Sequence, residues 1–97
     1  MEDNLLKLRR WMSHGNPRQF YTEIAYKIAA QGYVAEIADE TVTCYRVKKQ
    51  GGFLGIGARQ VKTPVLVVAR QGEEVVIDEA HADAEFLQLL MDLLQAH

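Results

Sequence analysis

The sequence predicts an α+β domain with two helices, four consecutive strands in an antiparallel meander sheet and a final helix, in the order α-α-β-β-β-β-α. Apolar residues recur at helical spacing near both ends of the chain, whereas β-branched and aromatic residues concentrate between residues 33 and 77. The connections between the predicted strands are short, which favours antiparallel pairing because parallel strands need long crossovers. Since helices stand before and after the strands, we expect them to cover one face of the sheet.

Length and composition predict the broad class of protein. A chain of 97 residues, with 48% hydrophobic and 25% charged residues, is expected to form one small soluble domain over residues 1–97. The longest apolar run, residues 65–69, is too short to span a membrane, and the N-terminal residues do not resemble a signal peptide. The single cysteine, Cys44, cannot form an internal disulfide. Together these features predict a cytoplasmic protein.

Two helices are expected first. One is predicted from Asn4, as its N-cap, to about Ser13. The second has stronger signals, because Asn16 can cap it and Pro17 suits its first helical position. Gly32 can end this helix because glycine adopts a positive φ without strain. Its apolar stripe consists of Phe20, Tyr21, Ile24, Ala25, Ile28 and Ala29.

Four strands are predicted after these helices, over residues 33–38, 41–48, 61–69 and 74–77. Asp39-Glu40 and Gln71-Gly72 are expected to turn the chain between neighbouring strands. Pro64 has no N–H to donate to a neighbouring strand, so it should lie at a bulge or near the start of its strand.

The final helix is predicted from Glu79 or Ala80 to the end of the chain, with Asp78 as its cap. Most of its circumference is apolar, which is more than contact with one sheet face requires. The surplus is expected to pack against the first helix or against a second copy of the chain, and both alternatives stay open. In a second-copy arrangement the contact would consist either of Leu90 and Met91 or of Leu87 and Leu94.

Charge is distributed unevenly along the chain, although the net charge is only −2. Residues 41–72 contain six basic and no acidic side chains, whereas residues 73–97 contain seven acidic side chains and neither Lys nor Arg. The asymmetry predicts either an anion-binding hairpin or two oppositely charged segments that attract each other within the fold or between copies.

The glycine-rich stretch 48–59, between the second and third predicted strands, is the candidate site. Its four glycines allow successive N–H groups to converge on an anion, with basic side chains on either side. Phe53, Leu54 and Ile56 are unusually apolar for a loop, so they are expected either to fold onto the core as a lid or to form a contact patch. The candidate binding residues are Arg46, Lys48, Lys49, Gly51, Gly52, Phe53, Leu54, Gly55, Ile56, Gly57, Arg59 and Lys62.

The residue patterns do not support other chemistries. The glycine spacing matches neither the dinucleotide fingerprint nor a Walker loop, and its Gly-x-x-Gly letters join two strands rather than the two helices of a KH domain. The carboxylates form adjacent pairs in turns and caps, and the three histidines lack metal-ligand spacing. Cys44 is expected to be a buried core residue. We therefore predict no catalytic residue, no metal site and no cofactor.

Residues 52–57 spell Gly-Phe-Leu-Gly-Ile-Gly, and this motif resembles the signature of the Jag N-terminal domain family. That family places GFLGIG or GFLGLG between two strands that follow a helix, and the likeness covers about residues 17–68. This chain differs by an extra hairpin before the motif, by Ala58-Arg59-Gln60 after it, and because no RNA-binding domain follows within its 97 residues. The resemblance implies a bacterial, non-enzymatic module near RNA-binding or envelope-associated proteins.

These observations favour a small non-enzymatic binding or assembly module. Its basic, glycine-rich hairpin would contact a protein or an anionic partner, of which RNA is one candidate. The alternative is a structural protein-interaction domain that self-associates through the final helix, with the glycine-rich loop serving only as a lid on the core. Membrane insertion is not expected in either case.

Overall fold

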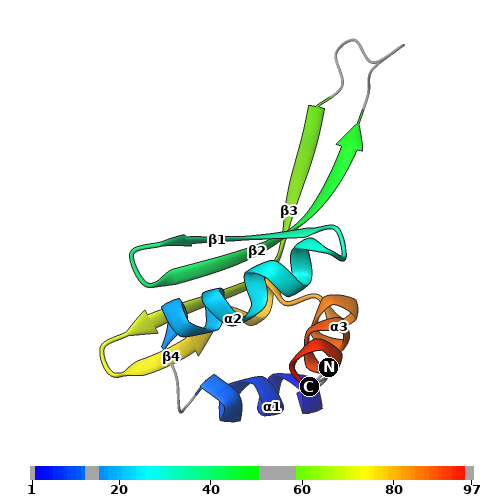
Figure 1. Ribbon diagram of the computed structural model, residues 1–97. Helices are drawn as coiled ribbons and strands as arrows, with labels where there is room; N and C mark the ends of the chain where they lie inside the picture. Colours follow the sequence, from blue (N-terminus) through cyan, green and yellow to red (C-terminus); the bar gives the residue numbers. More distant parts are fainter. Residues whose placement is uncertain (1, 13–15, 51–58, 96–97) are drawn as a thin grey trace.

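The computed structural model describes residues 2–12, 16–50 and 59–95. Within these residues, three α-helices and a four-stranded antiparallel sheet follow in the order α-α-β-β-β-β-α, which confirms the predicted α+β fold class (Figure 1). A short 3-10 helix, η1, precedes the last α-helix. The elements are α1 (Glu2–Met12), α2 (Pro17–Ala29), β1 (Tyr33–Ala38), β2 (Thr41–Gln50), β3 (Arg59–Gln71), β4 (Glu74–Ile77), η1 (Glu79–His81) and α3 (Ala84–Gln95).

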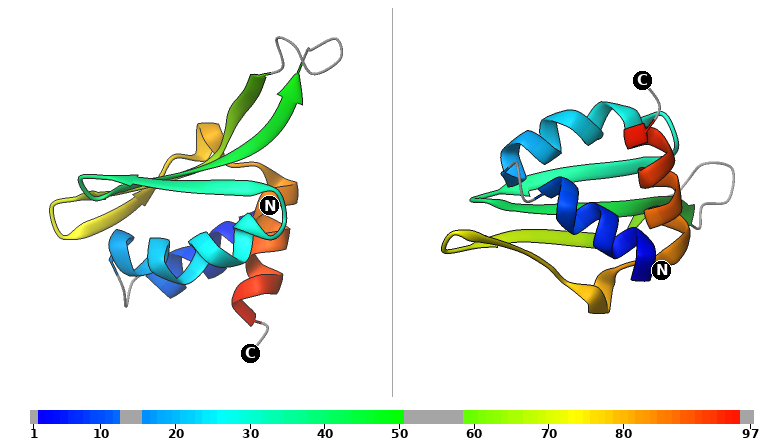
Figure 2. Two further views of the ribbon diagram at one scale, coloured as in Figure 1. Left: turned by 45° about the horizontal axis from the view of Figure 1, so that its top comes forward. Right: turned by 90° about the horizontal axis from the view of Figure 1, so that it is seen from below.

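The sheet is a meander in which the strand order β1-β2-β3-β4 follows the chain and every neighbouring pair is antiparallel. All three α-helices lie on the same face of the sheet (Figure 2). Alternate strand residues point toward these helices, so the core lies between the two layers. It includes Val42, Cys44, Leu66, Val68 and Ile77 from the strands and Phe20, Ile24, Ile28, Phe86, Leu87 and Leu90 from the helices.

Helix α2 forms as its sequence signals predict. Asn16 is the N-cap, and its side-chain oxygen accepts a hydrogen bond of 2.7 Å from the backbone N–H of Gln19. Pro17 occupies the first helical position, where a missing N–H leaves no hydrogen bond unmade. After the last turn Gly32 adopts a φ of +89°, which favours glycine and directs the chain into β1.

The prediction that Asn4 caps the first helix is wrong, because α1 already begins at Glu2. Asn4 lies inside the helix, and its side-chain amide donates a 3.2 Å hydrogen bond to Gln88 of α3. The buried face of α1 consists of Leu5, Leu8 and Met12, which join the common core. This helix supplies one of the partners that the broad apolar surface of α3 requires.

The prediction of a continuous final helix from Glu79 or Ala80 is also wrong. Asp78 does act as a cap, because its carboxylate accepts from the N–H of Ala80, but the helix that it caps is only η1. Helix α3 begins at Ala84, where the carboxylate of Asp83 accepts from the N–H of Phe86 at 2.9 Å. The N–H of Asp83 donates to the carbonyl of Val65 in β3, and this hydrogen bond to the sheet interrupts the helix.

Pro64, expected at a bulge or near the start of its strand, lies beside a bulge. Cys44 lies opposite Leu66 and Tyr45 lies opposite Pro64, so Val65 is an extra residue in β3. Both strands are longer than predicted, because β2 continues to Gln50 and β3 begins at Arg59.

The pairing between β1 and β2 ends at Tyr33 and Arg46, and β4 pairs only with residues 68–71. Residues 47–50 and 59–62, which we call the arm, therefore continue past the sheet as a two-stranded ribbon (Figure 1).

Candidate functional site

Arg46 stands at the base of the arm and points to the helix-covered side of the sheet. Its guanidinium lies 3.1 Å from the carboxylate of Asp83 and 3.8 Å from that of Glu85. The same group lies 6.0 Å from the centre of the Tyr33 ring. A hydrogen bond to Tyr33 and the two nearby carboxylates raise the pKa of Arg46. This predicted site residue therefore joins β2 to the start of α3, and its charge is largely compensated inside the chain.

Lys62 points to the opposite side of the sheet. Its ammonium group donates a 2.7 Å hydrogen bond to Glu36 of β1 and lies 5.8 Å from the centre of the Tyr45 ring. The hydrogen bond and the charge of Glu36 raise the pKa of Lys62. A second predicted site residue is thus paired within the sheet, although its side chain is still accessible.

Among the predicted cations whose side chains the structure describes, Lys48 is the one most available to a partner. It lies on the arm opposite Val61, is exposed, and forms no ion pair with any other described residue. The backbones of Lys49 and Arg59 belong to the arm strands, but their side chains lie outside the described residues. The other predicted site residues also lie outside them, so whether Phe53, Leu54 and Ile56 form a lid or a contact patch stays a prediction. These residues are Gly51, Gly52, Phe53, Leu54, Gly55, Ile56 and Gly57.

A second surface was not predicted from the sequence, namely the face of the sheet opposite the helices (Figure 2). No helix of the described residues covers it. We call it the bare face. Its central residues are Val34, Glu36, Thr43, Tyr45, Val47, Val67, Ala69 and Val76. A signal for it was present, because the strands carry apolar residues at both odd and even positions, as in the apolar run 65–69.

The sheet is also polarised in charge along its strands. The turns between β1 and β2 and between β3 and β4 both lie at the end of the sheet opposite the arm (Figure 1). This turn end carries Asp39, Glu40, Glu73 and Glu74, all exposed. Arg70, a basic residue at the same end of the sheet, lies 3.7 Å from the carboxylate of Glu40. The arm strands contain Lys48, Lys49, Arg59 and Lys62 and no acidic residue. The two ends therefore carry opposite net charge.

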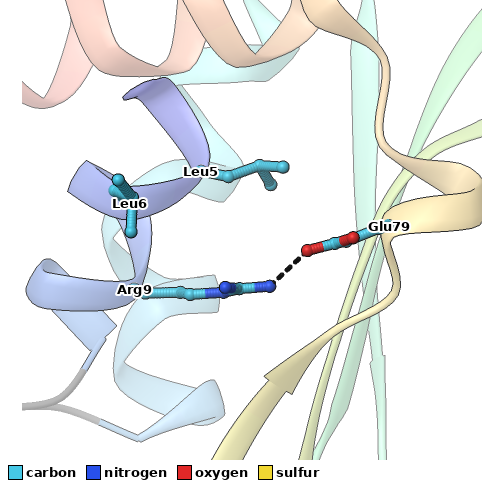
Figure 3. Close-up of a pocket in the computed structure, with 4 residues that line it drawn as sticks. All are labelled: Leu5, Leu6, Arg9 and Glu79. Atoms are coloured by element: carbon cyan, nitrogen blue, oxygen red, sulfur yellow. Dashed lines mark hydrogen bonds and ion pairs between the residues drawn. The ribbon is translucent and has the colours of Figure 1, made fainter. Parts of the chain in front are cut away.

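Two of the hollows on the described surface differ in volume and position. Figure 3 shows one of about 250 Å³ between α1 and η1, lined by Leu5, Leu6, Arg9 and Glu79, with an ion pair between the last two. This volume is below the range of most small-molecule sites. The other, of about 600 Å³, lies on the bare face beside η1. Its lining includes Val67, Ala69, Gln71, Val76 and Asp78.

The titratable groups of the described residues do not form a reactive cluster. His81 contacts Asp78 at 2.8 Å, a pairing that the sequence analysis missed, and both side chains are substantially exposed. Cys44 is fully buried, and burial raises the pKa of its thiol to about 12. Among the residues that the structure describes, no group of three or more His, Cys, Asp or Glu side chains could hold a metal ion.

The residues named for self-association through the final helix lie inside the molecule. Leu87, Leu90, Met91 and Leu94 are all buried within the chain's own core. The broad apolar surface of α3 packs against α1, α2 and the sheet. Of the two alternatives for this surface, contact with the first helix is present in the structure, and the packing gives no support to a second copy.

Comparison of the chain with protein-family models, with curated proteins and with solved structures finds no match. Within the described residues, none of the helices combines the length and the apolar character needed to cross a membrane.

Proposed function

We propose that this protein is a small bacterial, cytoplasmic binding module without enzymatic activity, and that its basic hairpin contacts an anionic partner. The observation that supports this proposal is the arm, a two-stranded ribbon that extends beyond the sheet and contains basic but no acidic residues. A ribbon of two strands is marginally stable by itself, which is typical of segments that gain contacts on binding. Lys48 is exposed there and makes no described ion pair.

RNA is the first anionic partner to test. The resemblance of residues 52–57 to the Jag N-terminal domain signature supports this choice, since that family is associated with RNA-binding proteins. Phosphate contacts by Lys and Arg release counterions, so binding should weaken as salt increases.

Fluorescence anisotropy with a labelled single-stranded RNA would measure this binding at about 50 mM and about 200 mM salt. We expect Lys48→Ala to weaken binding and to make the dependence of log K on log salt shallower by roughly 0.7, the effect of one lost phosphate contact. Lys7→Ala, an equal change of charge on an exposed position of α1, should leave both quantities unchanged.

No detectable binding at about 50 mM salt would show that RNA is not the partner. Equal effects of the Lys48 and Lys7 substitutions would show that net charge, and not the arm, governs binding.

A further inference from the structure

Arg46 and Lys48 lie on the same side of β2, two residues apart. Side chains alternate along a strand, and Arg46 faces the helices because it meets Asp83 at the start of α3. Lys48 therefore faces the same way, about 6.6 Å farther along the strand. Their partners across the ladder in β3 are the uncharged Thr63 and Val61. A ligand with two neighbouring phosphates that contacts Lys48 would thus bring its second phosphate close to Arg46.

The two cations differ in what already surrounds them. Lys48 is exposed and forms no ion pair with another described residue. Arg46 lies 3.1 Å from the carboxylate of Asp83 and 3.8 Å from that of Glu85. The Asp83 carboxylate is fixed, because it also accepts from the N–H of Phe86 at the start of α3. The Glu85 side chain is 84% exposed and makes the longer contact, so it can leave Arg46 without breaking a helix cap.

We propose that Glu85 competes with an anionic partner for Arg46 and so lowers the affinity of the protein for phosphate groups beside Lys48. This inference rests on the proposed function, in which the arm contacts an anion. A guanidinium presents five N–H donors in a planar fork, so Arg46 can keep its contact with Asp83 while a phosphate takes the place of Glu85. An exposed ion pair is weak, so a phosphate can displace Glu85, but the displacement reduces the net gain from binding.

Arg46 is positioned to hold a phosphate after Glu85 has moved away. Its guanidinium lies 6.0 Å from the centre of the Tyr33 ring, and this ring packs against Phe86 with 4.8 Å between the ring centres. The aromatic contact and the ion pair with Asp83 together hold the guanidinium in place. Such preorganisation reduces the entropy that is lost on binding. Removal of the Glu85 charge should therefore free a cation that is already oriented.

Fluorescence anisotropy with a labelled single-stranded RNA tests the competition. Glu85→Gln removes the charge at almost constant size. At about 50 mM salt it should lower the dissociation constant roughly two- to fivefold, the effect of one exposed ion pair. Glu74→Gln makes the same change of charge at the turn end of the sheet, away from the arm, and should leave the dissociation constant unchanged.

Unchanged RNA binding in Glu85→Gln would overturn the inference while leaving the binding of RNA itself intact. Equal gains in Glu85→Gln and Glu74→Gln would assign the effect to net charge and would also overturn it.

A double-mutant cycle shows whether Glu85 acts through Arg46. Arg46→Gln should weaken RNA binding, and Glu85→Gln added to it should give no further gain in affinity. The same gain with and without Arg46 would contradict the competition. Circular dichroism would establish that each variant is folded, and if Arg46→Gln is not, the following titration decides.

A titration followed by NMR needs no change at Arg46 and separates the inference from the choice of RNA. Sodium tripolyphosphate is the probe, and the Arg46 Nε–H resonance is the signal. We expect this resonance to shift at roughly two- to fivefold lower probe concentration in Glu85→Gln than in the wild type. This result without RNA binding would retain the competition and reject RNA as the partner. A resonance that responds equally in the two proteins, or in neither, would refute the competition.

Discussion

Cys44 lies on the central strand β2, between Ala35 of β1 and Leu66 of β3, and it is fully buried. Removal from water disfavours the thiolate, which raises the pKa of this thiol to about 12. Because the thiolate is the reactive form, the protonated state of Cys44 and its burial both slow its reaction with reagents in solution. At the residue scale this side chain acts as a small hydrophobic group of the core.

We expect Cys44 in the native protein to react with a soluble disulfide reagent only as fast as the sheet opens, even at mildly alkaline pH. In denaturant the same thiol should react at once. A variant with Thr22→Cys on the exposed surface of α2 supplies the control, since its added thiol should react rapidly in the folded state. Rapid stoichiometric reaction of the wild-type chain under native conditions would contradict this assignment.

The ionisation of Asp78 makes the stability of the fold depend on pH. Its carboxylate contacts the His81 ring and also accepts from the N–H of Ala80, and these interactions lower its pKa below the ordinary 3.8. A lowered pKa in the folded state means that folding favours the ionised form. The resulting stabilisation is present above the ordinary pKa and is lost as the pH falls through the lower, folded value.

We therefore expect the thermal midpoint of the wild-type protein to fall as the pH is lowered from about 5 to below the ordinary Asp pKa. Asp78→Asn cannot titrate and should show a smaller decline over this range. Asp92→Asn, on the exposed surface of α3, is the matched control. Parallel pH profiles for wild type and Asp78→Asn would contradict the linkage.

At the element scale, side-chain caps decide where the helices begin. Asn16 and Asp83 each accept a hydrogen bond from a backbone N–H three residues later, which satisfies one of the free donors at a helix start. Asp83 has two further interactions, an ion pair with Arg46 and a backbone hydrogen bond to Val65. The sequence analysis expected only Asp78 as a cap, whereas α3 begins after Asp83, whose N–H donates to the carbonyl of Val65 in β3.

Asn16→Ala should reduce the free energy of unfolding by about 1 kcal/mol, the usual cost of losing an N-cap side chain. Asn16→Asp keeps an oxygen acceptor and should retain most of this stability. Urea unfolding of the three proteins measures the difference. Equal destabilisation by Ala and Asp would show that the cap hydrogen bond is not what stabilises this helix start.

At the scale of the whole molecule, stability is distributed unevenly. The centre of the sheet, represented by Cys44, Leu66 and Val68, is covered by helices and fully buried. The arm has no third strand beside it among the described residues and extends away from the helices (Figure 1). Local opening should therefore cost far less free energy in the arm than in the sheet.

Hydrogen exchange should reveal this difference in the full chain. In dilute solution we expect amides of residues 47–50 and 59–62 to exchange orders of magnitude faster than those of Cys44 and Leu66. Amides inside α2 give an internal reference for the folded chain. Arm amides as protected as that of Leu66 would contradict this view of the arm.

The sequence by itself determined the order of the α-helices and strands, the cap and first residue of α2 and the burial of Cys44, and it restricted Pro64 to a bulge or a strand start. Each depends on local chemistry: side-chain oxygen, a missing N–H, or apolar spacing. Only the tertiary structure decided that Arg46 and Lys62 pair with carboxylates distant in the chain, that α3 begins at Ala84, and that an apolar sheet face has no helix over it. These features arise from contacts between strands and helices far apart in the sequence, which local patterns do not specify.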